Sequence, residues 1–147
     1  MSSISRFYLS PYIGGYKLDK SSWPSGPWHS EPDTHYFTHQ ALPCAIIRSE
    51  QGHLCGYVGV EKYHPSVNST TSNLFVHGGV TWERWGDDNG LFWIGFDCAH
   101  DGDLVPKHKD RALPGTYRDI HYVRNEVMWL AEQLAQITPP LPLEFSE

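Results

Sequence analysis

Four polar side chains within seven positions form the most informative stretch of this 147-residue sequence. Asp97, His100, Asp101 and Asp103 follow an apolar run, residues 91–96, that is typical of a central strand. Three carboxylates and an imidazole suit Mg²⁺, Mn²⁺ or Zn²⁺, and a carboxylate–histidine pair suits general acid–base catalysis. The alternative is a turn in which the aspartates accept hydrogen bonds from backbone N–H groups. The spacing does not match an EF-hand, which needs glycine at its sixth position and glutamate at its twelfth.

A glycine pair lies upstream, in the sequence His77-Gly78-Gly79-Val80-Thr81. Two successive glycines let backbone N–H groups converge on an anion, and the Thr81 hydroxyl can add a further donor. His77 would then lie beside the anion as a cation or as a proton donor. The alternative is a glycine turn within a β-hairpin.

Tyr117, Arg118 and Asp119 open the helix predicted near the C-terminus. A helix N-terminus attracts anions through its free N–H groups and its dipole, and an arginine fork suits phosphate or carboxylate. In the alternative interpretation, Asp119 completes the helix cap and Arg118 pairs with it on the surface.

Together these motifs predict one site. We expect His77, Asp97, His100 and Arg118 to converge on a single cleft, although they are up to 41 positions apart. Aromatic residues make up 14% of the chain, and a base stacked on Trp82 would contribute ~1–3 kcal/mol. In the alternative interpretation, Trp82 belongs to the core. The predicted catalytic residues are His77, Asp97 and His100. The predicted ligand-binding residues are Gly78, Gly79, Thr81, Trp82, Tyr117 and Arg118, and the predicted metal ligands are Asp97, His100, Asp101 and Asp103.

The C-terminal helix has the clearest periodicity. Its apolar residues step by three or four and lay one stripe along a helix: Ile120, Val123, Val127, Leu130, Leu134 and Ile137. Thr116 followed by Asp119 predicts a capping box at the start of the helix. Pro139-Pro140 predicts its end.

Three strands are predicted over residues 44–48, 54–60 and 91–96, and a fourth, interrupted by the glycine pair, over residues 75–82. Gly56 and Gly59 in the second strand indicate a bulge or a close backbone approach. Strands followed by one long helix predict an α+β fold: a mostly antiparallel sheet with the helix on one face.

Three segments are expected along the chain. Residues 1–40 are rich in proline, histidine and aromatic residues, and we interpret them as an irregular segment packed on the domain, with a short strand near residues 6–9. Residues 41–138 are expected to form a single α+β domain. Residues 139–147 form a proline-rich, acidic tail.

Charge and composition limit the partners. The net charge of −6 makes the chain a poor binder of duplex nucleic acid, whereas a small nucleotide needs only one or two cations. We expect no membrane partner, because the longest apolar run is far below the ~18 residues of a membrane span. We also expect no signal peptide. The three cysteines lack paired spacing, which favours buried thiols in a reducing cytoplasm. A domain of this size has little interior for a ligand, so a pocket shared within a homo-oligomer is one option.

Several of these motifs occur together in a known set of proteins. They are Gly-Tyr-Val-Gly-Val with a following His-Pro (residues 56–60 and 64–65), His-Gly-Gly-x-Thr (77–81), Gly-Phe-Asp-Cys-Ala-His-x-Gly-Asp (95–103) and Tyr-Arg-Asp (117–119). Over residues 44–135 the sequence resembles small, mostly uncharacterised proteins of phage genomes, prophages and plasmids. That family carries no settled activity, so the resemblance implies a genomic context, the cytoplasm of a bacterial host, rather than a mechanism.

This context leads to three hypotheses, because small phage proteins often antagonise host defence. In the first, the protein binds and sequesters a nucleotide-derived immune signal, such as a cyclic oligonucleotide or an ADP-ribose derivative. In the second, it is a metal-dependent or acid–base hydrolase that cleaves such a signal, with a divalent metal as an optional cofactor. In the third, it is a structural or protein-binding domain whose motifs are turns and caps.

Overall fold

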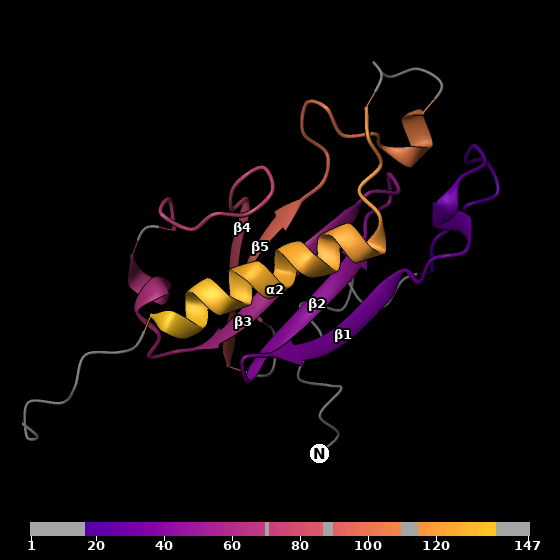
Figure 1. Ribbon diagram of the computed structural model, residues 1–147. Helices are drawn as coiled ribbons and strands as arrows, with labels where there is room; N and C mark the ends of the chain where they lie inside the picture. Colours follow the sequence, from indigo (N-terminus) through magenta and orange to yellow (C-terminus); the bar gives the residue numbers. More distant parts are fainter. Residues whose placement is uncertain (1–16, 70, 87–89, 110–114, 138–147) are drawn as a thin grey trace, which may run out of the picture.

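The computed structural model describes residues 17–69, 71–86, 90–109 and 115–137. Five antiparallel strands form one sheet in the order β1-β2-β3-β5-β4, and helix α2 (Ile120–Gln136) lies across one of its faces (Figure 1). The strands are β1 (Thr34–His39), β2 (Leu42–Arg48), β3 (Leu54–Glu61), β4 (Trp82–Trp85) and β5 (Leu91–Asp97). Short 3₁₀ helices lie at Pro27–His29, Pro65–Asn68 and Pro106–His108. The architecture is therefore the predicted α+β fold.

The three predicted strands over residues 44–48, 54–60 and 91–96 are confirmed as β2, β3 and β5. Strand β1 corrects the interpretation of residues 1–40 as irregular, because Thr34 pairs with Ile47 and His39 pairs with Leu42 in a hairpin with β2. The expected boundary between residues 40 and 41 therefore falls inside a hairpin turn. The expected strand near residues 6–9 and the tail 139–147 lie outside the described residues.

The predicted strand over residues 75–82 is wrong except for its last residue. Gly78 and Gly79 have φ values of 68° and 82°, and the N–H of Gly79 donates to the carbonyl of Val76, so this stretch is a turn. The strand itself, β4, starts at Trp82 and pairs with the far edge of β5. The positive φ at both glycines is left-handed backbone, which breaks the strand before β4 begins.

Helix α2 confirms the predicted apolar stripe, since Val123, Val127, Leu130 and Leu134 are buried. Its cap differs from the prediction: the helix begins one residue after Asp119, whose carboxylate accepts from the N–H of Tyr122 at 2.8 Å. Thr116 does not cap the helix, because its backbone N–H and carbonyl bond to the loop that follows β5. No helix in the described ranges is long and apolar enough to span a membrane.

The main core lies between the sheet and α2. Gly56 allows the close approach that the sequence indicated, because a side chain there would meet Val127 and Phe96 at 2.5–2.6 Å. Gly56 pairs on both sides without a bulge. A second apolar cluster lies on the opposite face of the sheet and consists of Ala45, Ile47, Tyr57, Leu91 and Trp93, with Tyr36, Cys55 and Trp82 packed against it.

Candidate functional site

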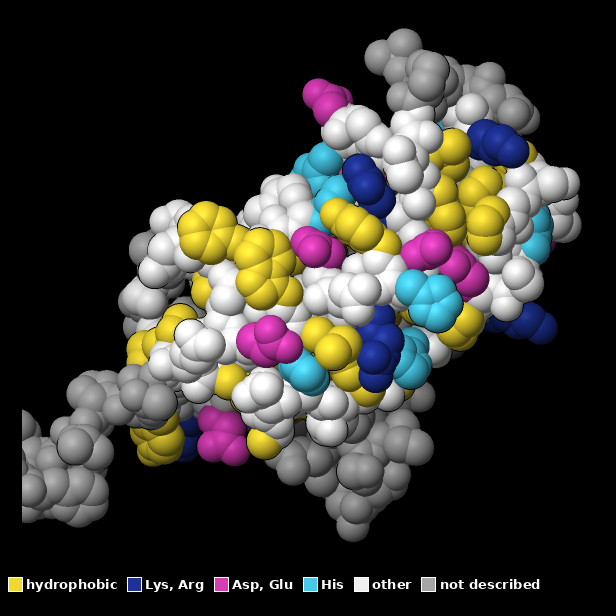
Figure 2. Space-filling view, viewed as in Figure 1, with side chains coloured by type: hydrophobic (Ala, Val, Ile, Leu, Met, Phe, Trp, Pro, Cys, Tyr) yellow, Lys and Arg dark blue, Asp and Glu magenta, His cyan; other side chains and the backbone are white. Residues whose placement is uncertain are grey.

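A cluster of polar side chains forms where three segments meet: the turn before β4, the loop after β5 and the start of α2. We call it the histidine cluster and define it as His77, Asp97, His100, Asp103, Arg118 and Tyr122. Figure 2 shows histidine, basic and acidic side chains side by side on the surface above the N-terminal half of α2. Residues far apart in the sequence are thus brought together, as predicted, whereas the single cleft stays a prediction.

Asp103 is the centre of this cluster. Its side chain is 1% exposed, and its carboxylate contacts His77 Nε2 at 2.8 Å and accepts from Arg118 Nε at 2.9 Å and from the His100 N–H at 3.0 Å. Burial alone raises the pKa of Asp103, but the hydrogen bonds from His77, Arg118 and the His100 amide outweigh it and lower the pKa below its usual value. Asp103 is therefore a buried carboxylate that orients three other groups.

His77 is held on every side. Its Nε2 faces Asp103, its Nδ1 lies 2.8 Å from the Tyr122 hydroxyl, and its backbone N–H donates to Glu126 Oε1 at 2.8 Å. In the neutral tautomer protonated at Nε2, the imidazole donates to Asp103 and accepts from Tyr122. Both ring nitrogens are thus engaged.

His100 lies beside His77, with ring centroids 6.0 Å apart. Its Nε2 is 3.2 Å from Asp97 Oδ1, a distance that fits an ion pair, but the orientation is not that of a hydrogen bond and this buried nitrogen has no hydrogen-bond partner. The contact is therefore an electrostatic one when His100 is protonated. The other nitrogen, Nδ1, has no hydrogen bond to a described residue, and the side chain is 33% exposed, so Nδ1 is the nitrogen that a ligand can reach.

Asp97 and Gly78 hold the ring of His100 in place. The Asp97 carboxylate accepts from the Ala99 N–H and from the Thr81 hydroxyl, both at 3.0 Å, so Asp97 also caps the turn as the alternative interpretation expected. Gly78 packs against the imidazole, and a Cβ at this position would lie 2.3 Å from His100 Nε2. A glycine is needed here both for its φ of 68° and for this contact.

The predicted anion nest at the glycine pair is not formed. The His77 N–H donates to Glu126, and the Gly79 N–H donates to the Val76 carbonyl. Thr81 donates its hydroxyl to Asp97 rather than presenting it to a ligand. Because these donors are already used inside the protein, the turn positions His77 and His100 instead of binding an anion through its backbone.

The helix N-terminus is also occupied. Asp119 accepts from the Tyr122 N–H, and Glu31 Oε2 accepts from the Ile120 N–H at 3.1 Å. Arg118 therefore remains as the predicted anion-binding group at this end of α2. Its Nε is bound to Asp103 and its guanidinium lies 4.9 Å from the centre of the Tyr122 ring, while a quarter of its side chain is exposed.

Tyr117 and Trp82, both predicted to bind ligand, lie elsewhere. The Tyr117 hydroxyl donates to Glu31 and accepts from Arg48 at 2.8 Å, in a buried network behind the start of α2. Trp82 packs in the apolar cluster on the sheet face opposite α2, where Arg84 covers its ring at 4.5 Å. Tyr117 thus has structural partners that the sequence did not indicate, whereas Trp82 packs in an apolar cluster as the alternative interpretation expected.

The four predicted metal ligands are not gathered into a metal site. Within the described residues, no group of three or more His, Cys, Asp or Glu side chains is placed to hold a metal ion. Asp101 is exposed, and Asp103 is surrounded by nitrogen donors. The arrangement instead favours acid–base chemistry between paired carboxylates and imidazoles.

Three further residues belong to this region, and the motif analysis missed them. Tyr122 and Glu126 follow Arg118 at intervals of four, so helical periodicity could have placed them beside it. His53 lies in the β2–β3 turn, where its Nδ1 is 3.0 Å from the Ser49 hydroxyl. Burial lowers the pKa of His53, although the negative charges of Asp97 and Asp103 oppose this shift.

The three cysteines are buried or partly buried thiols that do not form disulfides. Cys44, Cys55 and Cys98 are free thiols, and burial raises the pKa of Cys44 and of Cys55 to about 12. Burial likewise raises the pKa of Cys98, so all three stay protonated and unreactive at neutral pH. This agrees with their interpretation as small buried side chains.

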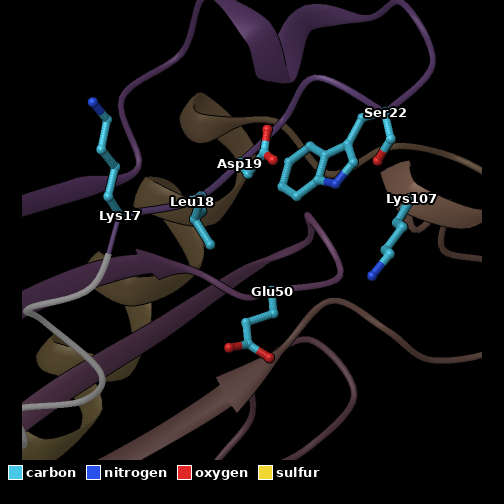
Figure 3. A pocket seen from close by; sticks show the side chains of 7 residues that line it. Lys17, Leu18, Asp19, Ser22, Glu50 and Lys107 are labelled. Carbon is cyan, nitrogen blue, oxygen red and sulfur yellow. The ribbon is translucent and has the colours of Figure 1, made fainter.

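A separate pocket of about 340 Å³ lies on another part of the surface (Figure 3). It is lined by Lys17, Leu18, Asp19, Ser22, Trp23, Glu50 and Lys107. None of the predicted site residues lines this pocket. Its lysines and carboxylates are exposed, and each charge is therefore well solvated.

No family model, curated protein or solved structure matches this chain. Functional inference therefore rests on the geometry of the histidine cluster.

Proposed function

We propose that the histidine cluster is an acid–base site that hydrolyses a small phosphodiester. The observation that carries this proposal is the pairing of two neighbouring imidazoles with two carboxylates: His100 with Asp97, and His77 with Asp103. Hydrolysis of a phosphodiester needs one group that takes a proton from water and another that protonates the leaving oxygen. Two histidines backed by carboxylates on one surface can supply both groups.

In this mechanism His100 is the base. Its exposed Nδ1 removes a proton from a water molecule, whose oxygen then attacks phosphorus, while Asp97 beside Nε2 stabilises the imidazolium that forms. The His77–Asp103 pair acts as the matching acid. The exposed part of the Arg118 guanidinium neutralises charge on the non-bridging phosphate oxygens in the transition state.

The second candidate function is sequestration of the same class of ligand without cleavage. One observation favours it: Arg118 is fixed by Asp103 on one side and by the Tyr122 ring on the other, which orients its guanidinium before a ligand arrives. A cation held in this way loses little side-chain entropy on binding a phosphate.

The resemblance to phage and prophage proteins supports nucleotide-derived immune signals as the substrate class. Cyclic oligonucleotides and ADP-ribose derivatives carry the phosphodiester or pyrophosphate groups that this site would act on, and bacterial hosts use such molecules as immune signals. The protein would then counter host defence in the host cytoplasm, as a monomer or as a homo-oligomer.

The test is an incubation of purified protein with cyclic dinucleotides and with cyclic ADP-ribose, followed by heat denaturation and chromatography. Linear or hydrolysed products support the hydrolase, and intact ligand released by heat supports sequestration. Absence of both uptake and products would contradict both functions and favour a structural domain. A parallel incubation with EDTA should leave the hydrolysis rate unchanged, whereas a loss restored by Mn²⁺ or Zn²⁺ would contradict the acid–base mechanism.

The variant His100→Ala sharpens this test. It should lower the hydrolysis rate by roughly 10²- to 10⁴-fold, the range of general base catalysis. His121→Ala is the matched control, because His121 is exposed on α2 and lies outside the histidine cluster. Equal rates in the two variants would contradict the role given to His100.

A further inference from the structure

His77 has no free nitrogen with which to reach a ligand. Its Nε2 contacts both carboxylate oxygens of Asp103, at 2.8 and 3.0 Å, and its Nδ1 contacts the Tyr122 hydroxyl at 2.8 Å. If His77 is the acid of the proposed reaction, its proton must therefore leave through a neighbouring group. Tyr122 is the neighbour on the side of His77 that faces away from the buried carboxylate.

Tyr122 is well placed for this role. Its ring meets the His77 ring edge-on at a centroid distance of 5.4 Å, and the Arg118 guanidinium lies 4.9 Å from its centre. The side chain is only partly buried, whereas Asp103 behind His77 is almost fully buried. Tyr122 thus contacts two groups of the site: its hydroxyl meets a histidine that is tied to a carboxylate, and the face of its ring meets an arginine that can hold phosphate.

We propose that the Tyr122 hydroxyl is the catalytic group that passes the proton of His77 to the leaving oxygen. This inference rests on the proposed hydrolase function and names a third residue of the same site. It predicts a relay of three side chains, in the order Asp103, His77, Tyr122, with the phenol at the ligand end.

The proton transfers balance. The oxygen of water bonds to phosphorus and loses one proton to His100, and the bond between phosphorus and the leaving oxygen breaks. The leaving oxygen takes the phenolic proton of Tyr122, and the phenol oxygen takes the Nδ1 proton of protonated His77. His100 gains one proton and His77 loses one, and exchange with solvent restores both.

The environment of Tyr122 keeps the phenol protonated for this step. Burial raises its pKa, and the Glu126 carboxylate one turn along α2 raises it further, while Arg118 opposes both. A phenol that stays protonated at neutral pH has a proton to donate to the leaving oxygen.

The experiment uses the variant Tyr122→Phe, which removes the hydroxyl and keeps the ring that packs against His77 and Arg118. Two substrates are compared: cyclic di-AMP, whose leaving alkoxide needs a proton, and thymidine 5′-p-nitrophenyl phosphate, whose leaving phenolate does not. We expect kcat for cyclic di-AMP to fall by roughly 100-fold or more and kcat for the nitrophenyl ester to fall less than about 3-fold. KM for both substrates should stay within about 2-fold.

Tyr63→Phe is the matched control, because Tyr63 is 74% exposed and lies outside the histidine cluster, and it should leave both rates unchanged. If Tyr122→Phe lowers both rates equally, the hydroxyl only supports the structure and the relay is overturned. Unchanged rates in Tyr122→Phe overturn it as well. If the wild-type protein cleaves neither substrate, the proposed function fails and the relay fails with it, an outcome that the wild-type assay alone reveals.

Discussion

Asp103 determines the arrangement of the cluster at the scale of single residues. One nearly inaccessible carboxylate accepts from His77, from Arg118 and from the backbone of His100, so these three contacts fix two candidate catalytic residues and one candidate anion-binding residue at once. A buried charge is tolerated because each of these donors compensates for the loss of hydration. Asp103 is therefore a positioning residue, and its removal should disturb stability and activity together.

The stability contributed by Asp103 should depend on pH. Because its pKa is lowered in the folded protein, its contribution is fully present above the ordinary value of 3.8 and is lost as the pH falls through the lower, folded value. We expect Asp103→Asn to lower Tm by about 5 °C at pH 7, for ~2 kcal/mol of lost charge-assisted hydrogen bonding, with a smaller difference from wild type below pH ~4. Thermal denaturation across this pH range measures it. Asp101→Asn, an exposed change in the same loop, should match wild type throughout.

Gly78 and Gly79 should respond differently to the same change. Both have positive φ, so alanine at either position costs ~1–2 kcal/mol of backbone strain and a few degrees of Tm. Only at Gly78 would the new Cβ meet the His100 ring, at 2.3 Å, whereas no atom lies within 4 Å of the position at Gly79. Gly78→Ala should therefore abolish hydrolysis or ligand uptake and Gly79→Ala should retain it. Equal ligand handling in the two variants would show that the position of His100 is unimportant.

At the scale of elements, helix α2 organises the site from one face. Arg118, Tyr122 and Glu126 recur every four residues and contact Asp103, the His77 ring and the His77 N–H in turn. The opposite face carries the stripe that packs on β2 and β3. The helix therefore links the core to the site, and a shift of its first turn would move Tyr122 together with Arg118, which lies two residues before the helix.

The N-cap of α2 gives a direct test of this element. Asp119→Ala removes the bond to the Tyr122 N–H and should cost ~1 kcal/mol, which lowers Tm by roughly 2–4 °C. Thr116→Ala should leave Tm within about 1 °C, because the Thr116 side chain is exposed and only its backbone is bonded. Calorimetry on the two variants decides between the two possible caps. A larger decrease in Tm for Thr116→Ala than for Asp119→Ala would support the capping box that the sequence predicted.

At the scale of the whole molecule, Arg48 joins three distant segments. Its side chain is fully buried, and its five N–H groups donate to Asp33, Glu31, the Pro32 and Gly52 carbonyls and the Tyr117 hydroxyl. Glu31 in turn accepts from Tyr117 and from the first N–H of α2. The segment before β1, the β2–β3 turn and the start of α2 are thus held by one guanidinium.

Loss of Arg48 should therefore destabilise the whole fold. Arg48→Met leaves buried carbonyl and carboxylate acceptors without their donor and should cost ~3–5 kcal/mol, or about 10 °C in Tm. Lys20→Met is the control, because the Lys20–Asp33 ion pair is partly exposed and should cost no more than ~1 kcal/mol. Denaturant unfolding of both variants measures the difference. Similar midpoints would mean that the buried network contributes little beyond apolar packing.

The sequence by itself determined the helix and the strands that are encoded by the pattern of neighbouring residues. The apolar stripe of α2 and the runs of β2, β3 and β5 predicted the α+β fold, because periodicity depends only on neighbours along the chain. Proximity of His77, Asp97, His100 and Arg118 was also predicted, although His77 lies in a turn and not in the predicted strand. Strand β1 was missed because its short sequence, Thr34–His39, has no apolar run, and its pairing with β2 is not visible from neighbours along the chain.

Only the tertiary structure decided which partner each polar group has. The sequence could not show that Glu126 takes the His77 N–H, that Tyr122 takes the His77 Nδ1, or that Tyr117 turns away toward Arg48. Hydrogen bonds between distant segments depend on how those segments pack, and several residues of suitable chemistry compete for each donor. The sequence therefore determined which groups could meet, whereas packing determined that the expected anion nest became a support for two histidines.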